Sequence, residues 1–474
     1  MTLNRELRRL FFGLLIAFAI VAAAAAYWGI WERDALLARE DNPRLVEARA
    51  AIRRGAIYDR TGQLLVVSEV EGQRVIRRYL RPETYSALGY YSLRYGAGGI
   101  ESDFDTQLSG STLPRTVEDV LLNRPAVGAS IQVTFDSSVQ RAVINAMSGR
   151  HGAVVVMRVQ DGALLALASL PTFNPNTLDQ DWERLREAPE NPFFNRALQG
   201  RYQPGGAWQT PLLAATLSTG TVADEVLERA AAPVRLGNLV LVCAQMPSTS
   251  DLTFAQAYAY GCPAPFTTLI APDNNRAFLM LPPSFPPAPA PTATSAEPPT
   301  PTPTAPSSEN PLRDNLLGQG TITVNPVSMT MLVASIVNGG NAPQPYTLAA
   351  LQPPDGTWQA QSTASPTLPI MTAETAEQLR GLMLNAVNTG AARAAARPDM
   401  EIGGHAAFAY AGDGALSWFV GFTTLNGQDG IAVTVVLENT RDADAAATIG
   451  STALAAARDA LLVASSPTLP QTGS

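Results

Sequence analysis

An uncharged segment near the start of the chain limits what the rest of the protein can be. Leu10–Trp31 is a run of 22 residues without a charged side chain, and a helix of about 20 apolar residues is long enough to span a bilayer. Arg5, Arg8 and Arg9 precede this run, and basic residues that flank a span stay on the cytoplasmic side. The sequence therefore predicts a single-pass membrane anchor that places residues 32–474 on the extracytoplasmic side of the cell membrane.

The sequence allows two interpretations of the N-terminal segment and two of the cysteine pair. A cleaved signal peptide is the alternative to an anchor, because Ala22–Ala26 has the small side chains of a cleavage site, although the length of the uncharged run favours the anchor. The two cysteines, Cys243 and Cys262, are too few for a disulfide framework or a zinc site. They form either one bridge or two buried thiols.

The composition narrows the classes of function. Of the 474 residues, 46% are hydrophobic and 16% are charged, so most of the chain is expected to fold into domains with cores. The formal charge of -8 disfavours nucleic acid as a partner. All 33 basic residues are arginine, so any chemistry that needs a lysine amine is excluded.

Local patterns predict an α+β domain in the second part of the chain. Asp136 is placed as the N-cap of a helix, and Asp161-Gly162 as the tight turn between two strands. The other expected elements are a helix closed by Gly339 and Gly340, strands in "LSWFVGFTT" and "GIAVTVVLENT", and a final helix over Ala445–Ser465. Strands at both ends of this block, with helices between them, suggest one sheet that is completed late in the chain.

A proline-rich stretch interrupts that domain. Residues 282–311 contain 12 prolines among Ala, Thr and Ser, and such a composition predicts a disordered or polyproline-like excursion. The expected divisions are a cytoplasmic tail (1–9), a membrane anchor (10–31), a small β-rich N-terminal module (32–125), an α+β domain (126–465) interrupted by the insert, and a disordered tail (466–474).

The stretch "RYQPGGAWQT", residues 201–210, has the form of a reactive site without a reactive group. Pro204, Gly205 and Gly206 break the chain before an expected helix, whose free N–H groups would point at the turn. Gly206 has no side chain, however, and Gln209, one helical turn later, is neutral.

From residue 43 to 465 the chain resembles the class B penicillin-binding proteins, which are membrane-anchored transpeptidases that cross-link peptidoglycan. The stretches that carry the resemblance follow in the family's order: "RRGAIYDRTGQLL", "GYYSLRYGAGGIESDFDTQLSG", "TFDSSVQRAV", "GAVVVMRVQDGALLALASLPTFNPN", "NPFFNRALQGRYQPGG", "LLGQGTITVNPVSMTMLVASIVNGG" and "SWFVGFTTLNGQDGIAVTVVLEN". The resemblance implies a transpeptidase domain of the β-lactamase-like fold, an antiparallel sheet with helices, behind a smaller N-terminal module. It implies no cofactor and no metal.

The resemblance also implies three catalytic elements, and this sequence has lost each of them. In the family, a serine and a lysine in the order Ser-x-x-Lys begin a helix, so that the amine can take the serine proton. The matching positions for Ser-x-x-Lys, Ser-x-Asn and Lys-Thr-Gly are, in order, Gly206 and Gln209; Gly261, Cys262 and Pro263; Gly404, His405 and Ala406. Losing a nucleophile costs about a millionfold in turnover.

Four other side chains are candidates to replace the lost serine or its base. Thr210 is expected on another face of the helix, and His151, before a strand, is expected to be structural. Cys262 is a possible nucleophile only if a base lowers its pKa, and His405 is a conceivable partner across the cleft. A buried, inert cysteine is the favoured interpretation.

Three hypotheses follow for the function. The leading one is an inactive pseudo-transpeptidase that acts as a scaffold for wall-synthesis or division proteins, with peptidoglycan or its peptide stems as possible ligands. The second is an active peptidoglycan transpeptidase with a non-standard nucleophile. The third is a non-enzymatic wall-attached protein, because Leu469–Gly473 matches the sortase signal Leu-Pro-x-Thr-Gly, although only Ser474 follows it and a disordered tail is favoured.

Overall fold

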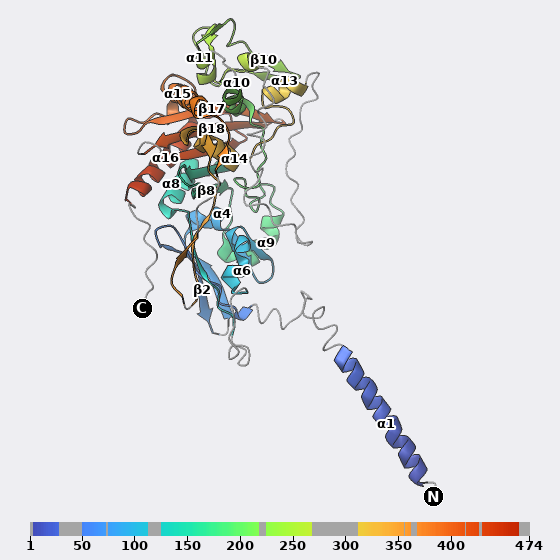
Figure 1. The fold of residues 1–474 in the computed structure, drawn as a ribbon. Coiled ribbons are helices and arrows are strands. Elements are labelled where there is room, and N and C mark those ends of the chain that lie inside the picture. Colours follow the sequence, from blue (N-terminus) through green and yellow to red (C-terminus); the bar gives the residue numbers. More distant parts are fainter. Residues whose placement is uncertain are drawn as a thin grey trace.

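The fold was obtained as a computed structural model of the chain (Figure 1). It describes residues 3–27, 50–72, 74–111, 125–217, 224–267, 311–354, 356–361, 367–412, 414–425 and 429–463. Most of the proline-rich stretch 282–311, the tail 466–474 and the end of the uncharged run therefore lie outside the described residues. Pro311 is the exception, because it begins the short helix α13 (Pro311–Leu316) rather than ending an excursion.

The described part of the uncharged segment is helical as far as Ala26. Helix α1 (Leu3–Ala26) begins before the uncharged run and contains Arg8–Ala26, a stretch with a mean hydropathy of 2.3 that is long and apolar enough to cross a membrane. The last helix, α16 (Ala443–Val463), also has a suitable length and composition, but half of its apolar window is buried against the sheet. Only α1 is therefore interpreted as a candidate span.

A five-stranded antiparallel sheet forms the centre of the upper region in Figure 1. Its strand order is β17-β18-β19-β7-β8. The strands are β7 (Gly152–Arg158), β8 (Leu164–Leu170), β17 (Ile402–Ala411), β18 (Gly414–Thr424) and β19 (Gly430–Glu438). The late strand β19 pairs with the early strand β7, with Val435 opposite Val154, which confirms that the sheet is completed near the end of the chain.

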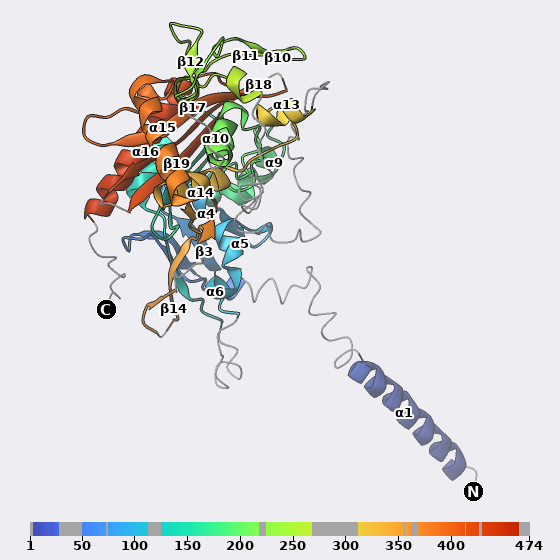
Figure 2. The same cartoon turned by 45° about the horizontal axis from the view of Figure 1, so that its top comes forward.

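Helices cover both faces of this sheet. On one face Val154 packs in a buried cluster with α16 and with α8 (Ser137–Met147). On the other face Val155 packs in a second cluster with α14 (Pro326–Val337) and α10 (Gln209–Leu217). This alternation follows from the period of two along a strand. The turn η4 (Gly205–Trp208), which leads into α10, packs beside β17, where the candidate site lies (Figure 2).

A second sheet lies at the other end of the folded region. Its order is β15-β14-β6-β1-β2-β3, with β1 (Ile57–Tyr58), β2 (Leu64–Glu71), β3 (Arg74–Tyr79), β6 (Ser130–Val133), β14 (Leu348–Gln352) and β15 (Gln359–Ala360). Strands β6, β14 and β15 come from beyond residue 125, so the N-terminal module shares its sheet with the chain of the second domain.

The remaining described elements are short, apart from α9 and α15. They are η2 (Pro82–Thr84), α4 (Tyr85–Leu88), β4 (Tyr90–Ser92), β5 (Gly96–Gly98), α5 (Ile100–Asp103), α6 (Asp105–Ser109), η3 (Pro175–Thr177), α9 (Leu178–Arg186), η4 (Gly205–Trp208), β9 (Val226–Leu227), β10 (Val234–Leu236), β11 (Leu239–Leu241), β12 (Leu252–Thr253), α11 (Phe254–Ala259), η5 (Ala264–Thr267), β13 (Asn341–Ala342), β16 (Leu368–Pro369), α15 (Ala373–Thr389) and η7 (Arg393–Ala395).

The local signals read from the sequence have clear counterparts. The Asp136 side chain accepts hydrogen bonds from the backbone N–H groups of Ser138 and Val139, as an N-cap of α8 should. Gly162 adopts a positive φ of 83° in the turn between β7 and β8, which glycine allows at little cost. The backbone carbonyl of His151 accepts a hydrogen bond from Glu438 N at 2.9 Å.

Candidate functional site

The glycine turn before α10 is held by contacts that exclude a side chain. The N–H of Gly205 donates to the carbonyl of Gly318 at 2.9 Å. Gly205 has a φ of 51°, and a Cβ atom there would lie 2.2 Å from the carbonyl oxygen of Phe408. Only glycine fits this position, because the left-handed backbone and the close approach of β17 each disfavour a Cβ.

The position that matches the family's serine is also closed. A Cβ atom on Gly206 would lie 2.8 Å from the Cβ of Ala407 on β17, a separation that real side chains do not tolerate without movement. Strand β17 therefore packs directly against the turn. The site lacks a nucleophile at Gly206 and also lacks the space that one would occupy.

Gln209 is the residue that the resemblance aligns with the family's catalytic lysine. Its side chain is buried, with 3% of its surface exposed, and its Nε2 donates to the carbonyl of Cys262 at 3.2 Å. Its Oε1 has no hydrogen-bond partner among the described residues. A neutral amide in this position can orient neighbouring groups, but it cannot accept a proton as an amine does.

His405 fills the space between the turn and α11. Its ring stacks on the ring of Tyr258, with centroids 4.2 Å apart and an interplanar angle of 9°, and its Nε2–H donates to the carbonyl of Gly206 at 3.2 Å. Burial lowers the pKa of His405 to about 4, partly opposed by the bond to Gly206. The imidazole is therefore neutral at pH 7, and its Nδ1 is a buried acceptor with no partner in the described part of the chain.

The two cysteines form a disulfide, Cys243–Cys262, with an S–S distance of 2.06 Å. The alternative of two buried thiols is therefore wrong for this structure, and a bonded sulfur is not a nucleophile. The proposed pairing of His405 with Cys262 is likewise not made, because the ring contacts Gly206 and Tyr258 instead.

Around the remaining positions of the degenerate site, neighbouring side chains leave little or no free space. A Cβ on Gly404 would meet the ring of Phe419 at 2.6 Å, so the lysine position of the third element lies over an aromatic ring. Ala406 is fully buried, and Gly261 has a φ of 63°. Thr210 does not face the turn, because its hydroxyl is 3.0 Å from the hydroxyl of Tyr258.

A small cavity remains beside the turn, with a volume of about 30 Å³. Among the described residues no charged side chain lines it; the described lining residues are Gly205, Gly206, Gln209, Leu241, Val242, Gly261, Pro263, Phe266, Leu316, Leu317, Gln319, Phe408 and Tyr410. The eight degenerate positions are thus brought to one place, and four of them, Gly206, Gln209, Gly261 and Pro263, line the cavity. Among the described residues no group of three or more metal-ligating side chains occurs.

Two arginines near the site were not expected from the sequence. Arg393 on η7 and Arg441 after β19 line a neighbouring cavity of about 650 Å³ that also contains Phe408. The guanidinium of Arg441 lies 5.0 Å from the centre of the Phe408 ring. Both arginines lie outside the three stretches that match the family's catalytic elements, so those motifs did not point to them.

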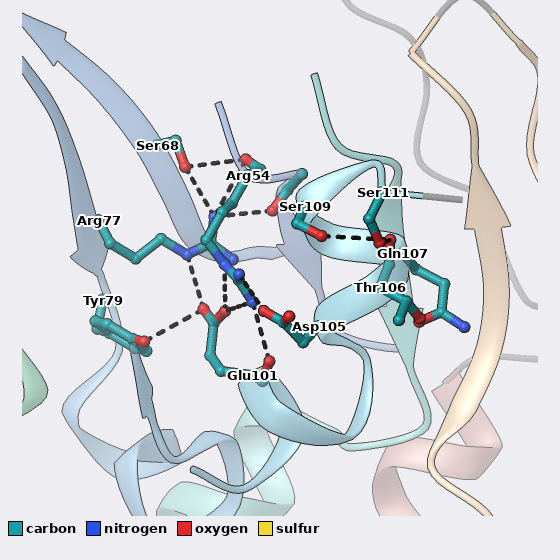
Figure 3. Close-up of polar contacts among 11 residues, drawn as sticks. Arg54, Ser68, Arg77, Tyr79, Glu101, Asp105, Thr106, Gln107, Ser109 and Ser111 are labelled. Carbon is teal, nitrogen blue, oxygen red and sulfur yellow. Dashed lines mark hydrogen bonds and ion pairs between the residues drawn. The ribbon is translucent and has the colours of Figure 1, made fainter. Parts of the chain in front are cut away.

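The molecule contains a second polar cluster, in the N-terminal module (Figure 3). The fully buried carboxylate of Glu101 accepts hydrogen bonds from Arg54 Nε at 3.0 Å, from Arg77 Nε at 2.7 Å and from the hydroxyl of Tyr79 at 3.2 Å. Arg54 also bonds Asp105 at 2.5 Å. This cluster, called the Glu101 network below, joins β3, α5, α6 and the segment before β1.

The architecture and the turn together define a class of protein. A five-stranded antiparallel sheet between helices, with a glycine turn at the head of α10 facing the edge strand β17, is the arrangement of the penicillin-recognising transpeptidases. The chain matches the family described as "Penicillin binding protein transpeptidase domain" over residues 152–237 and 304–459, and "Penicillin binding protein A dimerisation domain" over residues 54–131. The protein belongs to the penicillin-binding protein transpeptidase family.

Relatives and solved structures agree with this assignment. The peptidoglycan D,D-transpeptidase PbpA of Mycobacterium tuberculosis is 27% identical over 481 residues, which span 93% of this chain and 95% of PbpA. MrdA of Escherichia coli is 30% identical over 151 residues, or 28% of this chain and 24% of MrdA. The imipenem acyl-enzyme of M. tuberculosis penicillin-binding protein A superposes with a TM-score of 0.72 at 26% identity, covering 86% of this chain and 99% of that one.

Proposed function

We propose that this protein is a membrane-anchored, extracytoplasmic member of its family that takes part in peptidoglycan synthesis or cell division by binding rather than by acyl transfer. The observation that carries the proposal is the contact at Gly206. The serine is absent, and Ala407 closes the space where its side chain would lie. The relatives named above are peptidoglycan D,D-transpeptidases, which supports a role in the same process.

The other groups of the site support the loss of chemistry. Acyl transfer needs a nucleophile and a base, and the candidates are either neutral or already bonded. Gln209 has no basic nitrogen, and His405 is held neutral by burial with its Nε2–H on the Gly206 carbonyl. Cys262 is bonded to Cys243.

The location outside the cytoplasm is supported by two independent features. Within α1, the uncharged apolar stretch follows the basic residues Arg5, Arg8 and Arg9, and a disulfide persists in oxidising compartments. The match of residues 54–131 to a dimerisation domain suggests that a second copy, or a related protein, is a partner of the N-terminal module. The domain divisions proposed from the sequence are kept, with a sheet shared across residue 125.

The test is whether the full chain forms a covalent adduct with a β-lactam. The detergent-solubilised protein is incubated with imipenem and its intact mass is measured, with M. tuberculosis PbpA as the positive control. We expect the control to gain the mass of one opened antibiotic and this protein to gain none. A stoichiometric adduct would favour the alternative, an active enzyme with a non-standard nucleophile, and peptide mapping would then locate that residue.

A further inference from the structure

Two buried glutamines line the cavity beside the glycine turn, and in each of them one of the two polar side-chain atoms lacks a hydrogen-bond partner among the described residues. Gln209 is 3% exposed and Gln319 is 1% exposed, and both line the cavity. In the part of the chain that the structure describes, Gln209 Oε1 and Gln319 Nε2 have no hydrogen-bond partner. Leaving a buried polar atom unpaired costs about 1–3 kcal/mol, so this pair of atoms calls for a ligand or ordered water.

The neighbouring bonds fix which atom of each amide is left free. Gln209 Nε2 donates to the carbonyl of Cys262, and Gln319 Oε1 accepts from the N–H of Tyr410 at 3.3 Å. Turning either amide around would set oxygen against oxygen or N–H against N–H. The cavity therefore offers one free acceptor, on Gln209, and one free donor, on Gln319.

We propose that this cavity binds the primary carboxamide of a peptide ligand. A carboxamide carries an N–H₂ group that can donate to Gln209 Oε1 and a carbonyl oxygen that can accept from Gln319 Nε2, so its chemistry matches both free atoms. A carboxylate only accepts hydrogen bonds, and it would bring a charge into a lining whose described residues carry no opposite charge. This inference rests on the proposed function, since the ligand is bound and not converted.

The size of the cavity agrees with this ligand. A volume of about 30 Å³ holds roughly two water-sized groups. That matches the oxygen and nitrogen of one carboxamide and leaves the rest of the peptide outside. Such a group is supplied either by a peptide whose terminal carboxyl is amidated or by an asparagine or glutamine side chain, and we commit to the amidated peptide.

The experiment measures binding to the full chain in detergent micelles by calorimetry. The probes are N-acetyl-D-alanyl-D-alanine amide, the same dipeptide as the free acid, and an acetylated tripeptide with a central glutamine. We expect the amide to bind at least about tenfold more tightly than the acid, because the acid loses a hydrogen bond and buries a charge. Binding of the glutamine peptide instead of the amide would keep the carboxamide site and overturn the amidated source.

Variants separate this site from a general effect on the fold. Gln319→Glu replaces the free donor by an acceptor and is expected to weaken amide binding about tenfold, whereas Gln209→Lys restores an ammonium and is expected to reverse the preference toward the acid. Gln203 is the matched control, because it is buried with an unpartnered Oε1 but does not line the cavity. Gln203→Met should leave amide binding unchanged.

Two outcomes overturn the inference. Equal affinity for amide and acid, or no binding of either carboxamide probe, would mean that water alone fills the cavity. Equal loss in Gln203→Met and Gln319→Glu would mean that the variants act on the fold. Intact mass recorded on the same samples keeps the two proposals apart, because a covalent adduct contradicts only the proposed loss of chemistry, and failed amide binding without an adduct contradicts only this site.

Discussion

The Glu101 network and the glycine turn treat buried polar groups in opposite ways. In the network, one fully buried carboxylate is matched by Arg54, Arg77 and Tyr79 (Figure 3). Around the turn the described cavity lining contains no charged side chain, and buried polar atoms of Gln209 and His405 have no partner in the described residues. The comparison shows that one region uses charge to hold several segments together, whereas the other has exchanged charge for close packing.

The largest expected effect comes from breaking the network. Glu101→Ala removes the carboxylate and leaves Arg54 and Arg77, whose side chains are 3% and 5% exposed, as buried cations. Breaking a buried ion pair in this way costs about 3–5 kcal/mol. We expect that loss in the free energy of unfolding, measured by urea denaturation of the full chain.

A surface pair provides the control for that variant. Glu69 bonds Arg78 at 2.8 Å with both side chains nearly half exposed, and such pairs contribute about 0–1 kcal/mol. Glu69→Ala should therefore change stability little. If Glu101→Ala is as mild as Glu69→Ala, the network does not hold the module together and the contrast with the turn disappears.

Lowering the pH tests whether the His405 ring beside the glycine turn is held in its neutral form. Its pKa is about 4 in the native protein, below its ordinary value of 6.5, so between pH 6.5 and 4 the unfolded chain binds a proton that the native ring does not. The free energy of unfolding should therefore fall as the pH drops from 6.5 to 4, by about 3 kcal/mol from this group alone. Above pH 6.5 the contribution is flat.

The measurement compares the native protein with His405→Phe, which can keep the stacking on Tyr258 and cannot titrate. Urea denaturation at pH 7 and at pH 4.5 gives the change in stability for each protein, and carboxylates elsewhere contribute equally to both. The difference between the two slopes isolates the histidine. Identical pH dependence in the two proteins would show that the ring is not held neutral.

Removing the disulfide Cys243–Cys262, which lies next to the cavity residues Val242, Gly261 and Pro263, is expected to reduce stability by a similar amount. The bond joins residues 19 apart, and a loop of about 20 residues contributes about 3 kcal/mol in the chain-entropy description. Reduction, or the double variant Cys243→Ser/Cys262→Ser, should lower the melting temperature. If reduced protein also gains the mass of a β-lactam while the Cys262→Ser variant does not, the thiol is a nucleophile after all and the turn is not inert.

The sequence predicted the elements that depend on neighbouring residues. The cap at Asp136, the Asp161-Gly162 turn and the strand pair β18 and β19 were readable because a side chain and its partner lie within a few positions, or because alternation follows the sheet. The glycine at 206 and the neutral side chain of Gln209 were equally visible in the sequence, and the resemblance aligns them with the family's serine and lysine.

What the sequence did not show depends on contacts between distant segments. The approach of Ala407 to Gly206 joins residues about 200 positions apart, and no local pattern reports it. The same is true of the entry of β14 into the N-terminal sheet and of Arg393 and Arg441 beside Phe408. The structure thus adds that Ala407 occupies the space beside Gly206, whereas the sequence showed only which residue types stand at the aligned positions.

The smallest effect expected is that of restoring the serine, and it bears most directly on what the turn has become. Gly206→Ser places a Cβ 2.8 Å from the Cβ of Ala407, and overpacking of this kind costs about 1–3 kcal/mol. Gly206→Ser/Ala407→Gly removes the opposing methyl group and should recover part of that stability in the same denaturation assay. Neither variant should acylate with imipenem, because Gln209 and the neutral His405 still supply no base. Acylation of the double variant would show that close packing alone, and not the absence of ammonium groups, prevents acylation at this turn.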